Sequence, residues 1–332
     1  MKKENLKIVG RNSILSMVLI AVLVIATVSC EKEESDFISD PENTEMNILE
    51  VLESYNVPEA EDETSLKRGF IKHPTYFTLS VALARTGLAR TVATKQLTLF
   101  APTDAAFAKL KLYPWNISKV PNLKQILLYH VVQGKVYSYQ LSNGFVPTLN
   151  GAAVEINLEN GVKVNDATVI KADLRARNGV IHVIDNVLFP PDKNLVELAL
   201  SFDPEFSILV QAVIKAGLTD VLATGGPFTV FAPTNDAFSA LLSELKVKSL
   251  DDITVDLLTK VLLYHVVEGR VFSSDLVSGS ITTLNGDFKL DVGSLTITDA
   301  DNRVAGLIPE LLDVQATNGV IHVIDRVILP EL

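Results

Sequence analysis

The chain has 332 residues and a formal net charge of −11; 48% of its residues are hydrophobic and 7% are aromatic. This length allows two domains of ordinary size, each with a core of its own. The negative charge argues against a nucleic-acid partner, because phosphate recognition needs a basic surface.

Residues 1–29 have the pattern of a signal peptide. Basic residues precede an apolar run at 14–26, which is short for a membrane span, and small residues then lead to Cys30, the chain's one cysteine. Residues 27–30 (TVSC) resemble a bacterial lipobox, which implies lipidation of Cys30 (palmitate among the acyl chains) and a membrane anchor. The alternative is a simple secretory peptide with an incidental cysteine. Cleavage removes four of 29 basic and one of 40 acidic residues, so the mature net charge is −14.

Residues 30–45 are acidic and polar, which predicts a tether between the membrane and the first domain. Residues 31–34 (EKEE) resemble the surface-export signal of lipoproteins in some Gram-negative bacteria. The alternative is a solvated spacer, which is the usual role of a run of charges. We expect a lipid-anchored protein of the outer membrane that faces the cell exterior.

One stretch occurs twice without a change: NGVIHVID at residues 178–185 and again at 318–325. Asn-Gly is a turn signal that tolerates positive φ, and the β-branched run after it predicts a central strand that is apolar on both faces. Each copy closes one of two similar domains, which we place at residues 46–191 and 192–332. Residues 190–193 (PPDK) form a short join stiffened by proline.

Other segments pair in the same order. The offset between copies widens along the chain, so the additions belong in loops, and the charged stretch 58–69 is a surface loop of the first copy alone. The pairs predict an opening helix, a helix stopped by glycine, a short strand with a threonine-capped helix after its proline, and a hairpin turn, and one pair is a repeated Tyr-His segment. These pairs are 47–52 and 194–199, 76–88 and 206–218, 98–107 and 229–238, 127–132 and 262–267, and 148–151 and 283–286.

Three of these motifs identify a family. TLFAPTDAAF, Tyr-His and NGVIHVIDNVL resemble the conserved blocks of the fasciclin (FAS1) domain, and they occur twice in order over residues 46–332. The resemblance implies an α+β fold, in which each domain is a wedge of two β-sheets with helices packed on one side. It also implies an extracellular protein that binds other proteins or matrix polymers. The resemblance marks Tyr129, His130, Tyr264 and His265 as possible partner-binding residues, although the leucines beside them fit a core role equally well.

The repeated histidines have two interpretations. They could bind a metal ion, or they could be neutral, buried and hydrogen-bonded within the fold. Because no second ligand recurs beside them at metal-binding spacing, we expect structural roles, no metal and no cofactor. The histidines in question are His130, His182, His265 and His322.

Several carboxylates accompany the motifs. Asp104, with Asn235 or Asp236 in the second copy, is a possible partner of the Tyr-His histidine. Asp185 and Asp325 follow the central strands, where a carboxylate usually accepts backbone N–H groups. Residues 299–302 begin like a calcium loop, but Arg303 stands where a third oxygen ligand is needed, which predicts a solvated acidic turn.

The chain contains no nucleophile elbow, zinc helix, phosphate loop or paired-cysteine site. We therefore expect no enzyme, but a lipid-anchored surface protein for adhesion to, or binding of, an extracellular protein or polysaccharide. A first alternative is an accessory of a surface glycan-uptake system, for which Trp115 is the residue that could stack on sugar rings. A hydrolase and a structural envelope protein are further alternatives.

Overall fold

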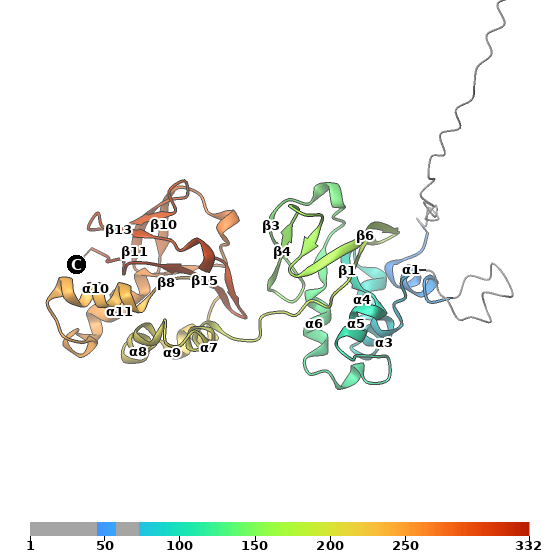
Figure 1. Cartoon of the computed structure of the whole chain (residues 1–332), viewed down its shortest axis with the longest axis horizontal. Coiled ribbons are helices and arrows are strands. Elements are labelled where there is room, and N and C mark those ends of the chain that lie inside the picture. The colour runs from blue at the N-terminus through green and yellow to red at the C-terminus, as the bar shows by residue number, and fades with distance from the viewer. Residues whose placement is uncertain (1–44, 58–72, 332) are drawn as a thin grey trace, which may run out of the picture. The chain divides into compact units, whose positions relative to one another are not determined.

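The computed structural model describes residues 45–57 and 73–331. The expected signal peptide, lipidated Cys30, the tether and the loop at 58–69 lie outside these ranges. Pro41–Leu332 forms one compact unit, in which we call residues 46–191 domain 1 and residues 192–332 domain 2 (Figure 1). Among the described residues, no helix combines the length and apolar character needed to cross a membrane.

The helices of domain 1 begin and end at the expected signals. Asn47 and Glu50 form a capping box at the first helix, and the Thr103 hydroxyl accepts the Ala106 N–H at the start of another. Gly87, with φ of +72°, follows a third helix. The helices are α1 (Ile48–Ser54), α3 (Phe77–Arg85), α4 (Ala89–Thr94), α5 (Asp104–Lys109) and α6 (Leu123–Tyr129), with 3-10 turns η1 (Ile117–Lys119) and η2 (Ser138–Gln140).

The strands of domain 1 form one seven-stranded series in the order β2-β1-β7-β6-β5-β4-β3. They are β1 (Leu97–Pro102), β2 (Val131–Gln133), β3 (Gly144–Pro147), β4 (Ala153–Asn157), β5 (Lys163–Val164), β6 (Ala167–Ala176) and β7 (Gly179–Ile184). All six residues of β7 are buried, between parallel β1 and antiparallel β6. This confirms the predicted central strand.

The Asn-Gly pair before β7 has a different role from the one predicted. Ala176 pairs with Gly179, so the two-residue turn is Arg177-Asn178, and neither Asn178 nor Gly179 has positive φ. A Cβ on Gly179 would lie 2.1 Å from the Leu97 carbonyl oxygen. Glycine is needed here because two parallel strands approach closely, which is one of its recognised uses within a sheet.

The asparagine of the same pair joins three segments. The Asn178 Oδ1 accepts the Ile48 N–H at 2.9 Å, and its Nδ2 donates to the carbonyl oxygens of Val92 and Lys95, each at 2.7 Å. It therefore ties the start of α1 and the end of α4 to the central hairpin. Asn318 repeats this arrangement in domain 2.

Domain 2 repeats the element order with one change in its sheets. Its helices are α7 (Leu195–Ser201), α8 (Ser207–Lys215), α9 (Thr219–Thr224), α10 (Asn235–Leu245) and α11 (Val255–Tyr264), with turns η3 (Leu250–Asp252), η4 (Ser273–Asp275) and η5 (Pro309–Leu311). Its strands are β8 (Phe228–Pro233), β9 (Val266–Glu268), β10 (Gly279–Thr283), β11 (Gly286–Asp291), β12 (Thr296–Thr298), β13 (Val304–Gly306), β14 (Val314–Ala316) and β15 (Gly319–Ile324). They form two four-stranded sheets, β10-β11-β12-β13 and β14-β15-β8-β9.

The change has a local cause. In domain 1 the ten residues of β6 run through both parts of the wedge, with two register irregularities against β7. In domain 2 the corresponding chain is divided into β13 and β14, with Pro309 and η5 between them. Proline cannot donate to a strand ladder, so the strand is interrupted there.

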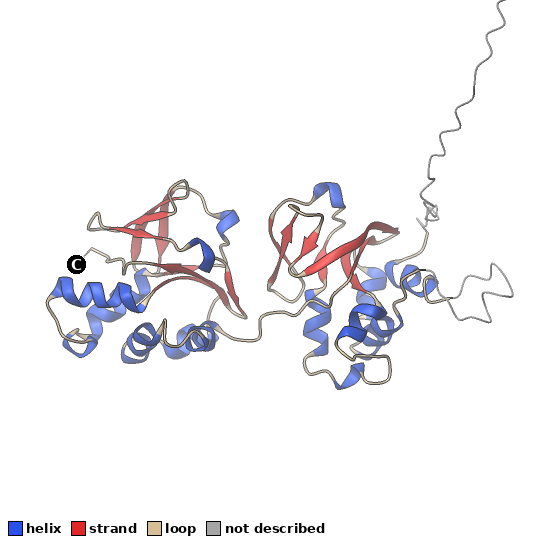
Figure 2. Ribbon diagram, viewed as in Figure 1, coloured by secondary structure: helices blue, strands red, loops and turns tan. Residues whose placement is uncertain are grey.

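Both domains have the α+β architecture predicted from the sequence. The α-helices gather along one side of the strands in each domain (Figure 2). Two apolar clusters flank the central strand of domain 1, with Ile181 and Val183 in the cluster shared with the helices and Ile184 in the other. Domain 2 is built in the same way, with Ile321 and Ile324 in separate clusters.

Candidate functional site

The Tyr-His segment lies inside domain 1. The Tyr129 hydroxyl donates to the Ala153 carbonyl oxygen at 2.8 Å. The His130 Nδ1 donates to the Ile126 carbonyl oxygen at 2.8 Å, and its Nε2 accepts the Leu188 N–H at 2.9 Å. Both nitrogens of this ring are therefore engaged, and the ring connects α6 to the segment after β7.

Domain 2 repeats these contacts. The His265 Nδ1 donates to the Val261 carbonyl oxygen at 2.7 Å, and its Nε2 accepts the Ile328 N–H at 3.1 Å. The Tyr264 hydroxyl donates to the backbone carbonyl oxygen of Asp287 at 2.7 Å. Burial lowers the pKa of His130 and of His265 to about 4, so both rings are neutral at pH 7.

This geometry bears on one prediction, that the Tyr-His pairs are possible partner-binding residues. Tyr129, His130, Tyr264 and His265 are all buried, so they offer almost no surface to a protein or polysaccharide partner. The leucines of the same segment pack into the core, and the Tyr-His pair is buried with them. Their direct role is to hold helix and strand together.

The central-strand histidines have a second set of partners. The His182 Nε2 donates to the Val136 carbonyl oxygen at 2.9 Å, and its Nδ1 accepts the Asp173 N–H at 3.4 Å. The Ser138 hydroxyl and N–H donate to the Asp173 carboxylate. In domain 2, Ser273, Asp313 and His322 repeat this arrangement.

Serine, aspartate and histidine thus meet at one place, but not as a nucleophilic triad. A catalytic serine would be hydrogen-bonded to the imidazole that takes its proton. Here Ser138 is bonded to the carboxylate, and the buried His182 ring faces a backbone carbonyl. Burial lowers the pKa of His182, against the smaller opposing effects of Val136 and Asp173. The arrangement fixes the backbone at Asp173, whose φ is +61°.

The sequence analysis missed these aspartates and serines. A signal was available, because an aspartate stands nine residues before the central histidine in both copies. Positive φ is tolerated by aspartate better than by most residues, and both Asp173 and Asp313 have it.

Asp104 is not the partner of His130. Its carboxylate accepts the Thr75 hydroxyl at 2.6 Å and the N–H groups of Phe77 and Thr78, so it caps the start of α3. In domain 2 Asn235, not Asp236, takes this position and accepts the Ile208 N–H at 2.9 Å. Asp236 is exposed in the first turn of α10, where its charge suits the helix dipole.

The carboxylates after the central strands contact backbone. The Asp185 carboxylate accepts the Thr168 N–H, and that of Asp325 accepts the Gly306 N–H, each at 2.7 Å. The first contact ties the end of β7 to its neighbour β6, and the second ties the end of β15 to β13 of the other sheet.

The acidic turn at 299–302 differs from the prediction. The Asp299 side chain is fully buried and accepts N–H groups of Asp301, Arg303 and Leu329. The Arg303 Nε donates to the same carboxylate at 2.9 Å. Arg303, the residue that argued against a calcium loop, is therefore the ion-pair partner of Asp299. Within the described ranges, no three His, Cys, Asp or Glu side chains are placed to hold a metal ion.

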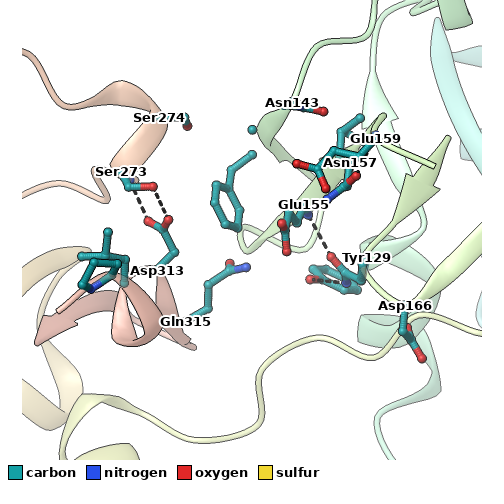
Figure 3. A pocket seen from close by; sticks show the side chains of 16 residues that line it. Tyr129, Asn143, Glu155, Asn157, Glu159, Asp166, Ser273, Ser274, Asp313 and Gln315 are labelled. Atoms are coloured by element: carbon teal, nitrogen blue, oxygen red, sulfur yellow. Dashed lines mark hydrogen bonds between the residues drawn. The ribbon is translucent and has the colours of Figure 1, made fainter. Parts of the chain in front are cut away.

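A polar pocket of about 730 Å³ lies where the domains meet. Figure 3 shows Asn143, Glu155 and Glu159 on one side and Asp313 and Gln315 on the other. At its edge the Gln315 amide accepts the N–H of Ala153 at 3.1 Å and donates to its carbonyl oxygen at 2.9 Å, and Phe145 stacks on Phe272 with ring centroids 4.1 Å apart. Carboxylates and amides suit a ligand rich in hydroxyl groups, and disfavour an anion.

Two aromatic pairs lie on the surface of domain 1. Trp115 is 76% exposed and stacks on Tyr113 with centroids 4.7 Å apart, and Tyr139 is 79% exposed and stacks on Tyr137 at 5.6 Å. Each pair presents a ring with most of its area in solvent. Sequence reasoning had singled out Trp115 but not Tyr139.

Comparison with known proteins gives a consistent result. The fasciclin domain model matches residues 74–190 and again 204–330. The chain is 33% identical to the pig transforming growth factor-beta-induced protein ig-h3 (Sus scrofa), in a match that covers 70% of this chain and 35% of that protein. It is 30% identical to human periostin, in a match that covers 86% of this chain and 33% of periostin. It thus spans about a third of the length of these two relatives. A Synechocystis protein, sll1483, is 43% identical over 42% of this chain and 74% of its own length.

Among solved structures, the FAS1 domain pair from the insect cell adhesion molecule Fasciclin I covers 76% of this chain and 95% of its own. The sequence identity is 23% and the TM-score is 0.36. The two matches to the family model cover most of the chain and contain both copies of the TLFAPT-type, Tyr-His and NGVIHVID motifs. The chain therefore belongs to the fasciclin domain family and carries two of its domains in tandem.

Proposed function

We propose that this protein is a non-catalytic, lipid-anchored surface protein that uses its two fasciclin domains to bind an extracellular protein or polysaccharide and so to attach the cell. Membership in the fasciclin family, which the chain shares with ig-h3 and periostin, supports the adhesive role. The buried histidines support the non-catalytic part, because their ring nitrogens are engaged within the fold.

One observation carries the proposal furthest: the exposed aromatic pairs of domain 1. Large exposed aromatic rings are common binding anchors, since they bury much area and lose little conformational freedom. Their stacking on Tyr113 and Tyr137 holds Trp115 and Tyr139 in place before a partner arrives. At the position of Tyr137 domain 2 has Phe272, which is buried, and at the position of Tyr139 it has Ser274, which has no aromatic ring. Domain 1 is therefore our proposed contact domain.

The test is an attachment assay with cells that carry the full chain. Cells should adhere to surfaces coated with extracellular proteins or polysaccharides, and the double variant Trp115→Ala and Tyr139→Ala should reduce adhesion at least tenfold. Phe77→Ala is the matched control, because Phe77 is an exposed aromatic residue of domain 1 without a stacked aromatic neighbour in the described chain. Equal adhesion of cells with and without the protein would refute the adhesive role.

The membrane anchor is tested separately. Replacing Cys30 with alanine should move the protein from the membrane to the soluble fraction, and protease added to intact cells should digest the unaltered protein. Unchanged fractionation of the variant would refute the lipid anchor, and protection of the unaltered protein from protease would refute the surface location.

A second candidate is a binding accessory of a surface glycan-uptake system. The stacked Tyr113 and Trp115 rings favour it, because sugar rings pack on flat aromatic faces. A glycan array probed with the protein separates the two candidates. Binding of defined glycans that Trp115→Ala abolishes would favour glycan uptake, whereas turnover of any substrate in a hydrolase screen would contradict both.

A further inference from the structure

An apolar cavity of about 150 Å³ lies in domain 2, beneath α7, α8 and α9. Its lining contains two polar side chains, Thr219 and His265, and both ring nitrogens of His265 are already bonded to backbone. The other lining side chains are aliphatic, apart from the ring of Phe231. A cavity of this size with apolar walls stays free of water and accepts a hydrocarbon group.

The cavity coincides with a difference between the two domains. The capping boxes at Asn47 and Asn194 align α1 with α7, so Ala199 in domain 2 corresponds to Leu52 in domain 1. Leu52 is 0% exposed and belongs to the core of domain 1. Ala199 lines the cavity and lacks the rest of that side chain.

The mouth of the cavity is also more apolar than the corresponding surface of domain 1. On α7, Leu200 stands where α1 has Glu53, and on α8, Ile214 stands where α3 has Ala84. Leu200 is 53% exposed and Ile214 is 61% exposed, and both line the cavity. Adjacent exposed aliphatic side chains around an apolar opening mark a binding site, since folding alone gains nothing from their exposure.

We propose that this cavity binds the end of a fatty acyl chain, a role that goes beyond adhesion. About six carbon atoms fill a cavity of this volume, and the remainder of the chain continues over Leu200 and Ile214. The lining contains no charged side chain, and its polar members are the neutral His265 ring and the Thr219 hydroxyl, so a carboxylate head group stays outside. An aromatic ring would fill the cavity alone and leave the apolar mouth uncovered, which favours a linear chain.

The experiment uses the full chain and a fatty acid that carries a photoreactive diazirine near its methyl end. After irradiation, labelled peptides should map to the segments that line the cavity, within residues 195–232, 262–266 and 321. Competition by unlabelled saturated fatty acids should strengthen about fourfold per added methylene while the cavity and its mouth are being filled. Ala199→Leu, which installs the residue of domain 1, should reduce labelling at least tenfold.

The control is Val277→Ser, which removes an exposed aliphatic side chain that does not line the cavity. Its labelling should equal that of the unaltered protein. Undiminished labelling of Ala199→Leu, or equal labelling of α1 and α3, would overturn the proposal. Displacement of the probe by benzene but not by fatty acids would overturn the choice of an acyl chain.

Discussion

The helical layers of the two domains begin from the same motifs and pack differently. In domain 1, Leu52, Leu88 and Leu99 are buried in one core. Their counterparts in domain 2 are Ala199, Leu218 and Val230, none of which is fully buried. The hydrogen-bonded positions, by contrast, are the same in both domains. The comparison teaches that the repeated residues fix the backbone, while side-chain volume at unrepeated positions decides whether a cavity forms.

The largest effect is expected where domain 1 is made to resemble domain 2. Leu52→Ala should lower the free energy of unfolding of domain 1 by about 2–5 kcal/mol, because it removes a fully buried side chain and leaves a cavity. Urea unfolding, followed by a domain-1 probe such as Trp115 fluorescence, measures this. A loss below about 1 kcal/mol would mean that the two helical layers are equally packed.

Lowering the pH should reduce the free energy of unfolding of the two domains by similar amounts. The pKa of His130 and of His265 is about 4 in the folded chain, against an ordinary value of 6.5. Between these values the unfolded chain binds more protons, so the free energy of unfolding falls as pH decreases from about 6.5 towards 4. The contribution is fully present above pH 6.5, and about 3 kcal/mol per histidine is lost by pH 4. Urea unfolding at several pH values measures it, and a flat profile over this window would contradict burial of both rings.

Replacing the central-strand histidine should destabilise each domain by the same amount. His182→Ala and His322→Ala each leave a partly buried carbonyl oxygen and a partly buried N–H without that partner, so each should lower the free energy of unfolding by about 1–3 kcal/mol. Trp115→Ala, a surface change, is the control and should shift it by less than about 0.5 kcal/mol. Full stability combined with lost ligand binding would make these imidazoles binding residues instead.

The smallest effect is expected where domain 2 is made to resemble domain 1. Ala199→Leu fills an existing cavity, so it should change the free energy of unfolding by less than about 1 kcal/mol in either direction. Thermal unfolding of the variant checks this. A loss of several kcal/mol would mean that the cavity cannot hold an aliphatic side chain, and would count against acyl binding as well.

The parts that sequence could predict are those set by local chemistry. The Thr103 cap, the Gly87 helix stop and the buried central strand depend on a few neighbouring residues, so their patterns are visible in one copy and repeated in the next. Repetition itself then gave the domain count and, through the family resemblance, the fold.

The parts that sequence could not predict depend on distant partners. Asn178 looked like a turn residue, yet its partners stand 83 to 130 positions earlier in the chain. Asp104 was predicted as a possible partner of His130, whereas its carboxylate instead caps the start of a helix from another part of the chain. The cavity at Ala199 required knowing which residues surround it, and the exposure of Trp115 required the folded surface.

Central to both domains is the claim that the repeated histidines are internal structural groups. An NMR titration of the histidine ring protons tests it directly. We predict that His130 and His265 titrate together near pH 4, as neutral buried rings with both nitrogens engaged. Titration of either ring near pH 6.5, or a ring resonance that shifts when a metal ion is added, would contradict the claim.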